Sequence, residues 1–354
     1  MLLMPAKVEK KAMKTSNPLT LVEGNRQRNN KMKAIVQTEY GSPDVLKLKE
    51  IDKPVVTDNG VLVRIRASSI NAGDWHLMRG DPFFIRLIFG GILKPKIQIL
   101  GVDIAGQIEA IGKNVTEFQV GDEVFGDLSE CGFGAFAEYV CAIASALALK
   151  PTNTSFEQAA TVPVAALTAL QGLRDCGKIQ SGKLVLINGA SGGVGSFAVQ
   201  IAKAFRAEVT AVCSTNKMEM MRSLGADHII DYTQIDVTKN GQQYDLILDA
   251  AAYRSVFDYK EILKTGGTYV LVGGSIGRLF QVMLFGSLIS RIMHRKVKFV
   301  TAKPNQSDLV ILRDLIEAGK IVPFIDRTYN LSDVPMAIRH LEQRQVRGKV
   351  AINV

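Results

Sequence analysis

A glycine-rich turn at residues 189–195, Gly-Ala-Ser-Gly-Gly-Val-Gly, has the residue types and spacing to cradle a phosphate. Aligned with the pattern G-x-G-x-x-G, it carries Ala190, Gly192 and Gly195 in the three glycine positions. Glycine at 192 lets backbone approach a pyrophosphate, and glycine at 195 lets a helix pack closely on a strand. Free N–H groups and the helix dipole attract the anion. This motif predicts dinucleotide binding, and the alternative is a purely structural turn. The predicted contacts are Ala190, Ser191, Gly192, Gly193, Val194 and Gly195.

The end of the next strand, at residues 208–213, distinguishes between the two nicotinamide cofactors. An Asp or Glu about 20 residues beyond the glycines would hold the ribose 2′-hydroxyl of NAD. Ser214 and Lys217 stand there instead, and a hydroxyl with a lysine suits a 2′-phosphate. We therefore predict NADPH, against the alternative that Lys217 is a solvated lysine at a helix start. Further predicted contacts are Tyr232 near the adenosine phosphate, Gly273 and Gly274 near the nicotinamide, and the backbone of residues 299–302.

Alternating apolar strands and helices between residues 151 and 301 would position the turn. Residues 183–188 form an apolar strand, 194–206 a helix, 208–213 a second strand and 218–224 a second helix. Buried strands that alternate with helices indicate a parallel sheet. We therefore expect a Rossmann-type, doubly wound parallel sheet over residues 151–301.

The flanking segments have a different texture. Residues 32–150 contain many short strands with Gly and Asp turns, which indicates a compact β-rich domain. Residues 302–354 read as two helices, at 308–319 and 333–344, and a closing strand at 349–354 that returns to that domain. Residues 1–31 are polar and basic and predict a disordered tail, or sequence upstream of a start at Met32.

Composition excludes several classes of protein. The chain has 354 residues, which suits two domains, and 47% hydrophobic with 22% charged residues is the balance of a globular enzyme. The formal charge is +9, but the first 33 residues hold eight Lys/Arg and two Glu, so no nucleic-acid partner is predicted. The four cysteines are far apart and lack metal-ligand spacing, which favours a reducing compartment and a cytoplasmic protein.

An apolar stretch at residues 279–290 is followed by several basic residues up to Lys298. It is shorter than the about 20 residues that cross a membrane. We expect a buried helix or a dimer contact beside the cofactor domain, and the alternative is an amphipathic helix on a membrane surface.

The chain from residue 32 to 354 resembles the medium-chain dehydrogenase/reductase superfamily, and within it the zinc-independent quinone oxidoreductase (zeta-crystallin-like) branch. The likeness rests on Ser-Ile-Asn-Ala-Gly-Asp at 69–74, Gly-Val-Asp-Ile-Ala-Gly at 101–106, Gly-Asp-Glu-Val at 121–124, Ala-Ala-Leu-Thr-Ala at 165–169, the turn at 189–195 and Leu-Gly-Ala-Asp at 224–227. The resemblance implies a GroES-like catalytic domain and a Rossmann domain with the active site between them, and a homodimer as the usual assembly.

The resemblance also bears on a metal. Zinc-containing relatives carry a cysteine in the loop where Asn71 stands and a Gly-His-Glu segment where residues 100–103 read Leu-Gly-Val-Asp. A catalytic zinc needs about three such ligands, so we predict no metal, and an improvised site of Asp74, His76 and Asp103 is disfavoured. His76 is expected to be a surface or packing residue beside Trp75. Without a Lewis acid, hydride delivery to an already electron-poor acceptor is the feasible chemistry.

Four residues are the candidates for that chemistry. Asn71 could donate its amide N–H to a substrate carbonyl or fix the nicotinamide ribose, and its alternative role is to form a turn. Thr168 matches a family threonine near the nicotinamide and could equally be an ordinary helix residue. Asp74 would line the pocket, and Tyr40 matches in region a tyrosine of the quinone pocket. Lys349 is interpreted as a solvated strand residue and left out.

The sequence thus predicts an NADPH-dependent, zinc-independent oxidoreductase that transfers a hydride to a quinone or an α,β-unsaturated carbonyl compound. One alternative is an alcohol or aldehyde dehydrogenase of the same superfamily. The other is a non-catalytic, NADPH-binding protein associated with a membrane, for which contact with a membrane surface would be needed.

Overall fold

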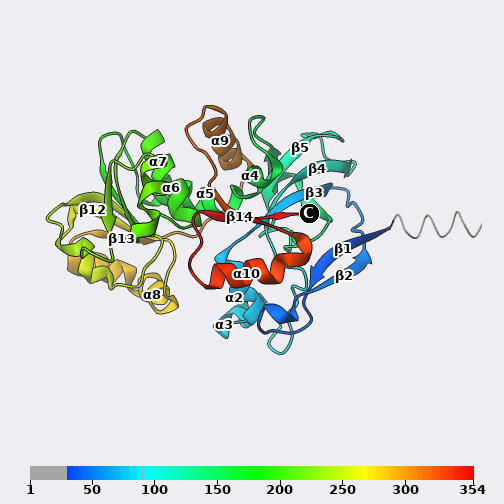
Figure 1. Cartoon of the computed structure of the whole chain (residues 1–354), viewed down its shortest axis with the longest axis horizontal. Coiled ribbons are helices and arrows are strands. Elements are labelled where there is room, and N and C mark those ends of the chain that lie inside the picture. The colour runs from blue at the N-terminus through cyan, green and yellow to red at the C-terminus, as the bar shows by residue number, and fades with distance from the viewer. Residues whose placement is uncertain (1–29, 90) are drawn as a thin grey trace, which may run out of the picture.

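The computed structural model describes residues 30–89 and 91–354, shown in Figure 1. Most of the predicted basic tail, residues 1–29, lies outside the described residues. Lys31, which the sequence assigned to the tail, is already the first residue of β1 (Lys31–Val36). It pairs with Asp52 of β2 (Lys47–Asp52) in the strand register and by a salt bridge of 2.7 Å. Cross-strand pairing therefore begins earlier than the apolar pattern indicated.

A largely antiparallel seven-stranded sheet forms one part of the molecule. Its order is β14-β15-β3-β4-β5-β7, and β6 also pairs with β3. The last strand along the chain, β15, runs antiparallel to β3, so the C-terminal segment adds to a sheet built from early residues. The strands are β3 (Gly60–Ile70), β4 (Asp103–Ile111), β5 (Glu123–Asp127), β6 (Tyr139–Ile143), β7 (Leu147–Leu149), β14 (Ile325–Asn330) and β15 (Lys349–Asn353).

A six-stranded parallel sheet forms the other part, in the order β10-β9-β8-β11-β12-β13. The order runs outward in both directions from the neighbours β8 and β11, as in a doubly wound sheet. The expectation of a β-rich domain with a Rossmann-type parallel sheet is therefore confirmed. The strands are β8 (Leu184–Asn188), β9 (Glu208–Cys213), β10 (His228–Asp231), β11 (Tyr244–Asp249), β12 (Leu263–Leu271) and β13 (Lys296–Phe299).

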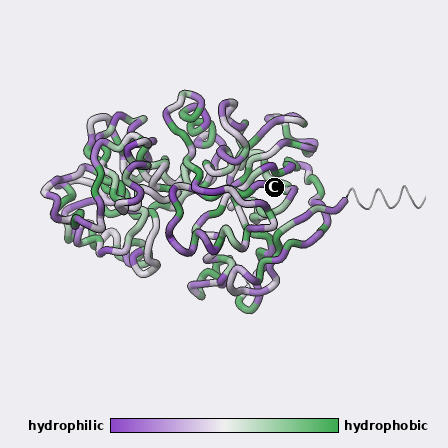
Figure 2. Tube along the Cα trace, viewed as in Figure 1, coloured by the Kyte–Doolittle hydropathy of each residue, from purple (hydrophilic) through white to green (hydrophobic). Residues whose placement is uncertain are grey.

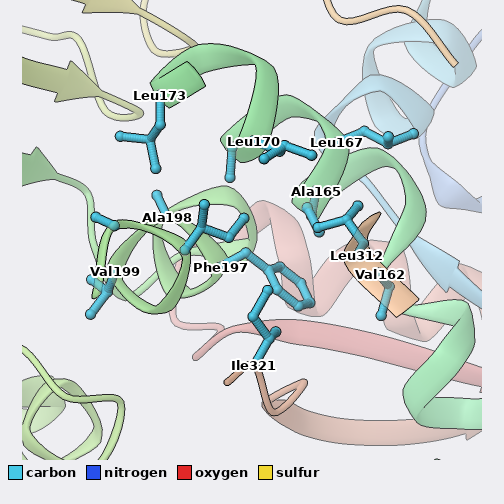
Figure 3. Packing of buried hydrophobic residues seen from close by; sticks show 14 of the residues in the cluster. Val162, Ala165, Leu167, Leu170, Leu173, Phe197, Ala198, Val199, Leu312 and Ile321 are labelled. Carbon is cyan, nitrogen blue, oxygen red and sulfur yellow. The ribbon is translucent and has the colours of Figure 1, made fainter. Parts of the chain in front are cut away.

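Helices cover both faces of the parallel sheet. Val185 and Ile187 of β8 point into a core with α5, α6 and α9, whereas Leu186 points into a second core with α8. Figure 3 shows Phe197 of α6 packed among side chains of the α5 region, Leu312 of α9 and Ile321. Successive side chains of one strand thus enter two different cores. Figure 2 shows hydrophobic stretches recurring through both parts of the chain.

The helices of the fold have the following bounds: α2 (Ala72–Arg79), α3 (Phe84–Ile88), α4 (Phe156–Ala160), α5 (Pro163–Gln171), α6 (Gly193–Ala204), α7 (Met218–Ser223), α8 (Ile276–Met293), α9 (Gln306–Glu317) and α10 (Val334–Glu342). Several differ from the predicted ranges by a few residues because caps set the ends. Helix α9, for example, begins before Asp308 because the Asn305 side chain accepts a hydrogen bond from the Asp308 N–H.

Helix α8 corrects one expectation. The apolar stretch was predicted to be a buried helix or a dimer contact. The buried helix is wrong, because only one side of α8 is buried, through Val282, Ile289 and Met293, and the dimer contact stays a prediction. On its other side Leu284 is 66% and Leu288 is 55% exposed. Within the described part of the chain, no helix is long and apolar enough to span a membrane.

Candidate active site

The glycine turn joins β8 to α6 at the carboxyl edge of the parallel sheet. Gly189 has φ +73°, and its carbonyl oxygen would lie only 2.2 Å from a Cβ built on Gly195. Gly195 is therefore required for the close approach of turn and helix. The N-cap of α6 is Gly192, which has no side chain to cap the helix, so the N–H groups of its first turn remain available to an anion.

The turn lies at the point where the sheet order reverses, between β8 and β11, which is where open α/β sheets bind ligands. A buried network joins these two strand ends. Asp249 accepts hydrogen bonds from the Asn188 amide and the Tyr269 hydroxyl, each at 2.7 Å. Burial raises the pKa of Asp249 despite these bonds. The network holds the ends of β8 and β11 together next to the turn.

The segment at residues 346–349 lies against the turn and against Lys217. Its Val346 carbonyl accepts a hydrogen bond from Lys217 Nζ at 2.9 Å, and the Gly348 N–H donates to the Ser191 carbonyl at 2.8 Å. The Lys349 side chain then lies over the turn, because a Cβ added to Gly193 would be 3.0 Å from Lys349 Cδ. No feature of the sequence predicted that the C-terminal segment contacts the nucleotide turn.

Lys349 corrects a second expectation, since it is 3% exposed rather than solvated. Its Nζ donates to Asn71 Oδ1 at 2.5 Å, to Asp103 Oδ2 at 3.1 Å and to the Ile70 carbonyl at 3.2 Å. A lysine ammonium has three N–H donors, so all three are used. Lys349 therefore holds its partners in place and has no donor left for another group.

Asp103, at the start of β4, is the common acceptor of the cluster and is fully buried. Its Oδ2 accepts from Ser69 Oγ at 2.6 Å and from Asn71 Nδ2 at 2.9 Å, in addition to Lys349. Its Oδ1 accepts from the Val164 N–H at 2.8 Å, at the N-terminus of α5. One buried carboxylate thus connects β3, β4, α5 and β15.

Asn71 is held at both ends of its amide. Its Oδ1 accepts from Lys349, and one Nδ2 hydrogen bonds to Asp103, so the amide cannot flip without losing both bonds. The second Nδ2 hydrogen has no acceptor among the described residues. An amide carries two N–H donors, so one oriented neutral donor remains for a ligand. Asn71 itself is half-buried.

Asp74 supports this loop from within. It is 2% exposed, and its carboxyl accepts hydrogen bonds from the Asn71 N–H at 2.7 Å and the Gly101 N–H at 3.2 Å. Burial, with the nearby Asp103 charge, raises the pKa of Asp74 to about 7 although the hydrogen bonds and Lys349 oppose this. The structure therefore places Asp74 in the first turn of α2, bonded to the backbone of Asn71 and Gly101, and its predicted place in the pocket lining stays a prediction.

Thr168 and Tyr40 are placed differently from Asn71. The Thr168 hydroxyl donates to the Val164 carbonyl at 2.7 Å, a bond within its own helix α5. Tyr40 donates to the Gly91 carbonyl at 2.8 Å and contacts Gly80, which caps the far end of α2. Asn71 and Gly80 cap opposite ends of α2, which is about 12 Å long. Tyr40 thus lies near the end of α2 opposite to Asn71, and its role in the substrate pocket stays a prediction.

The predicted 2′-phosphate residues gather at the ends of β9 and β10. Tyr232, which is 59% exposed, has its N–H bonded to the Cys213 carbonyl, next to Ser214. Lys217 is half-buried, and burial lowers the pKa of its ammonium. The sequence interpretation missed an acid here: Asp231, whose carboxylate accepts hydrogen bonds from Thr215 and Thr233. Asp231 was missed because it ends β10, whereas the sequence analysis looked for an acid only at the end of the strand at residues 208–213.

Gly273 and Gly274 follow β12 at the same edge of the sheet. A Cβ on Gly274, which has φ +138°, would lie 2.3 Å from the Ala252 nitrogen. Gly274 thus allows the segments after β11 and β12 to meet, in a bridge between Ala252 and Gly274.

His76 stacks on Trp75 with ring centroids 3.6 Å apart. Over residues 30–89 and 91–354, no group of three or more His, Cys, Asp or Glu could hold a metal ion.

Comparisons with known proteins agree with this architecture. Residues 57–152 match the alcohol dehydrogenase GroES-like domain family, and residues 224–352 match the zinc-binding dehydrogenase family. A 2-methylene-furan-3-one reductase of Solanum lycopersicum is 33% identical, covering 92% of this chain and 79% of its own. A chloroplastic NADPH-dependent alkenal/one oxidoreductase of Arabidopsis thaliana is also 33% identical, covering 91% and 79%. The structure of a quinone oxidoreductase from Coxiella burnetii superposes with a TM-score of 0.82 at 30% identity, covering 92% and 99%.

The chain therefore belongs to the medium-chain dehydrogenase/reductase superfamily, in its zinc-independent quinone oxidoreductase branch.

Proposed function

We propose that this protein is an NADPH-dependent oxidoreductase that transfers a hydride to a quinone or to the β-carbon of an α,β-unsaturated carbonyl compound. The relatives named as alkenal/one and furanone reductases, and the similar quinone oxidoreductase structure, support this class of acceptor. The observation that carries the proposal is the oriented amide of Asn71, which Lys349 connects to the nucleotide turn.

The crevice fits a dinucleotide. The uncapped first turn of α6 offers N–H donors to a pyrophosphate, and Gly192 leaves room because a Cβ there would have its nearest neighbour at 3.5 Å. We assign the 2′-phosphate to Ser214 and Lys217, with Tyr232 beside them, and the nicotinamide to the edge formed by Gly273 and Gly274. When bound, NADPH supplies the hydride.

Asn71 is proposed to stabilise the charge that develops on the acceptor. As the hydride adds, negative charge accumulates on the acceptor oxygen, and an oriented N–H donor stabilises it more than the neutral ground state. Lys349 Nζ on Asn71 Oδ1 withdraws electron density from the amide and strengthens the donor at Nδ2. Asn71 keeps its proton throughout, and the reduced acceptor takes its proton from solvent water. Asp74, Asp103 and Lys349 act as positioning residues, and Thr168 and Tyr40 remain candidates for lining the substrate pocket.

We also propose the finer organisation that the sequence predicted. The catalytic domain comprises residues 32–150 and 302–354, and the cofactor domain residues 151–301. The assembly is proposed to be a homodimer, which sedimentation analysis would test. A cytoplasmic location is proposed from the cysteine pattern; the Arabidopsis thaliana relative is named as chloroplastic, so imaging of the tagged full chain is the appropriate test.

Steady-state oxidation of NADPH with a matched set of acceptors tests the activity. The set is a benzoquinone, an enone and the saturated ketone of the same carbon skeleton. We expect turnover with the first two acceptors, little with the saturated ketone, and a preference for NADPH over NADH. Protein that binds NADPH, as seen by fluorescence titration, but reduces neither the quinone nor the enone would contradict the proposal.

A further inference from the structure

Two helices from different parts of the chain contact each other beside the crevice. Helix α3 follows α2, whose N-terminus carries Asn71, and α8 begins directly after Gly274 and Ser275. The rings of Phe84 and Phe280 meet edge to face, with centroids 4.9 Å apart. Figure 1 shows both helices on the lower side of the molecule. A surface formed by both helices therefore combines residues from the part of the chain with the antiparallel sheet and from the part with the parallel sheet.

Aliphatic side chains extend from this ring contact along both helices. Leu284 and Leu288 follow Phe280 at four-residue intervals, and Leu87 and Ile88 follow Phe84 by three and four residues, so each set lies on the same side of its helix as the contact. The exposed fractions are 66% for Leu284 and 67% for Ile88, and Leu93 beyond α3 reaches 89%. We call these residues, with Ile292, the α3–α8 surface. Single exposed aliphatic residues are common, but a gathering of this kind marks an interaction site.

The two segments that carry the α3–α8 surface hold only basic charged residues, and the exposed Asp81 and Glu261 directly precede them. No Asp or Glu occurs in residues 82–102 or in residues 262–307. Lys94 and Lys96 are exposed next to Leu93, and Arg291 and Lys296 are exposed at the end of α8. The surface thus combines apolar side chains with a rim of cations. A second copy of this chain would place these cations opposite cations, which is unfavourable.

We propose that the α3–α8 surface binds an anionic lipid bilayer, with α8 lying in the plane of the interface. A bilayer supplies both components that the surface needs: hydrocarbon for the leucine and isoleucine side chains, and negatively charged headgroups for the lysine and arginine rim. The attachment is peripheral, since no helix among the described residues is long and apolar enough to span a membrane. This inference does not depend on the proposed reduction.

Vesicle flotation of the full chain tests the inference. The vesicles contain phosphatidylcholine alone or phosphatidylcholine with phosphatidylserine. The apolar variant is L284Q/L288Q and the charge variant is K94Q/K96Q. The matched control, V55Q/V120Q, removes two valines that are 82% and 62% exposed elsewhere. Thermal unfolding and NADPH binding measure whether each variant is folded. We expect all variants to fold, because substitutions at exposed positions rarely change stability by more than about 0.5 kcal/mol.

We expect the wild type to bind the anionic vesicles and to bind the neutral ones much more weakly. Partition should fall on the order of tenfold or more in L284Q/L288Q and in K94Q/K96Q, and should be unchanged in V55Q/V120Q. Absence of wild-type binding would overturn the inference. So would undiminished binding of L284Q/L288Q, which would assign attachment to the basic N-terminal residues. A dimer that L284Q/L288Q dissociates, without vesicle binding by the wild type, would identify the surface as a self-association interface and also overturn it.

Discussion

Replacing Lys349 by methionine should affect stability and turnover together. Methionine retains the apolar stem that lies over Gly193 but removes the ammonium, leaving Asp103 fully buried without a cation. Removing one partner of a buried ion pair typically costs about 3–5 kcal/mol. Because a folded domain is stable by only about 5–15 kcal/mol, K349M should remain folded but unfold at markedly lower urea concentration.

The double variant K349M/D103N separates charge from packing. If the destabilisation comes from an uncompensated carboxylate, D103N should recover at least about 2 kcal/mol of it, as a coupling energy in the double-mutant cycle. The assay is urea unfolding of the wild type, both single variants and the double variant, with K320M at an exposed lysine as the control for loss of a lysine charge. Additive effects, or a K349M cost below about 1 kcal/mol, would refute the buried-pair reasoning.

K349M should also lower kcat for enone reduction by about tenfold or more, because Asn71 loses the donor on Oδ1 that fixes and polarises its amide. The KM for NADPH should change little, since the stem over Gly193 is retained. A purely structural role would instead leave kcat per folded molecule unaltered. A fall in kcat at an unchanged KM for NADPH thus distinguishes a positioning residue from a merely stabilising one.

Four further predictions follow. N71A should lower kcat about 10²–10³-fold at nearly unchanged NADPH affinity, measured by steady-state kinetics and fluorescence titration, because it removes the proposed oxyanion donor; an effect on affinity alone would contradict this role. G195A should lower the stability measured by urea unfolding, because its Cβ would lie 2.2 Å from a carbonyl oxygen. G192A should keep its stability but bind NADPH more weakly. Equal effects of the two substitutions on stability and on affinity would contradict the separate roles of Gly195 and Gly192. K217Q should weaken NADPH binding about tenfold in titrations and leave NADH binding nearly unchanged, and an equal loss for both would exclude a 2′-phosphate contact. Burial raises the pKa of Asp74 to about 7, so the folded protein retains a proton that the unfolded chain releases near pH 4. The free energy of unfolding of the wild type should therefore fall relative to that of D74N from about pH 4 to pH 7, by up to about 1.4 kcal/mol per pH unit. Parallel profiles of unfolding free energy against pH would contradict this.

The parts of the fold that the sequence predicted well are those governed by local rules. The turn at residues 189–195 and its flanking strand and helix follow from glycine geometry and apolar periodicity, both visible in a short window. Asn71 could be selected because its position within a family loop is a local feature. The helix ends shifted by a few residues because side-chain caps such as Asn305 decide them.

The parts that were missed depend on contacts between distant segments. Lys349 looks like a solvated lysine in its own sequence, and only the pairing of β15 with β3 brings it to Asn71 and Asp103. Tyr40 resembles a pocket residue by region, and its role stays a prediction because its hydrogen bond to Gly91 depends on segments that are far apart in the chain. Helix α8 has apolar residues on most sides, so its composition alone could not indicate which face remains exposed.

The most direct test of the central claim is a crystal structure with NADP⁺ and an enone or quinone bound. Our account predicts that Asn71 Nδ2 lies within hydrogen-bond distance of the acceptor carbonyl oxygen, with Lys349 Nζ still on Asn71 Oδ1 and the nicotinamide facing the acceptor. An acceptor oxygen bound to another donor, or an Asn71 amide turned away from a nicotinamide that binds elsewhere, would contradict it.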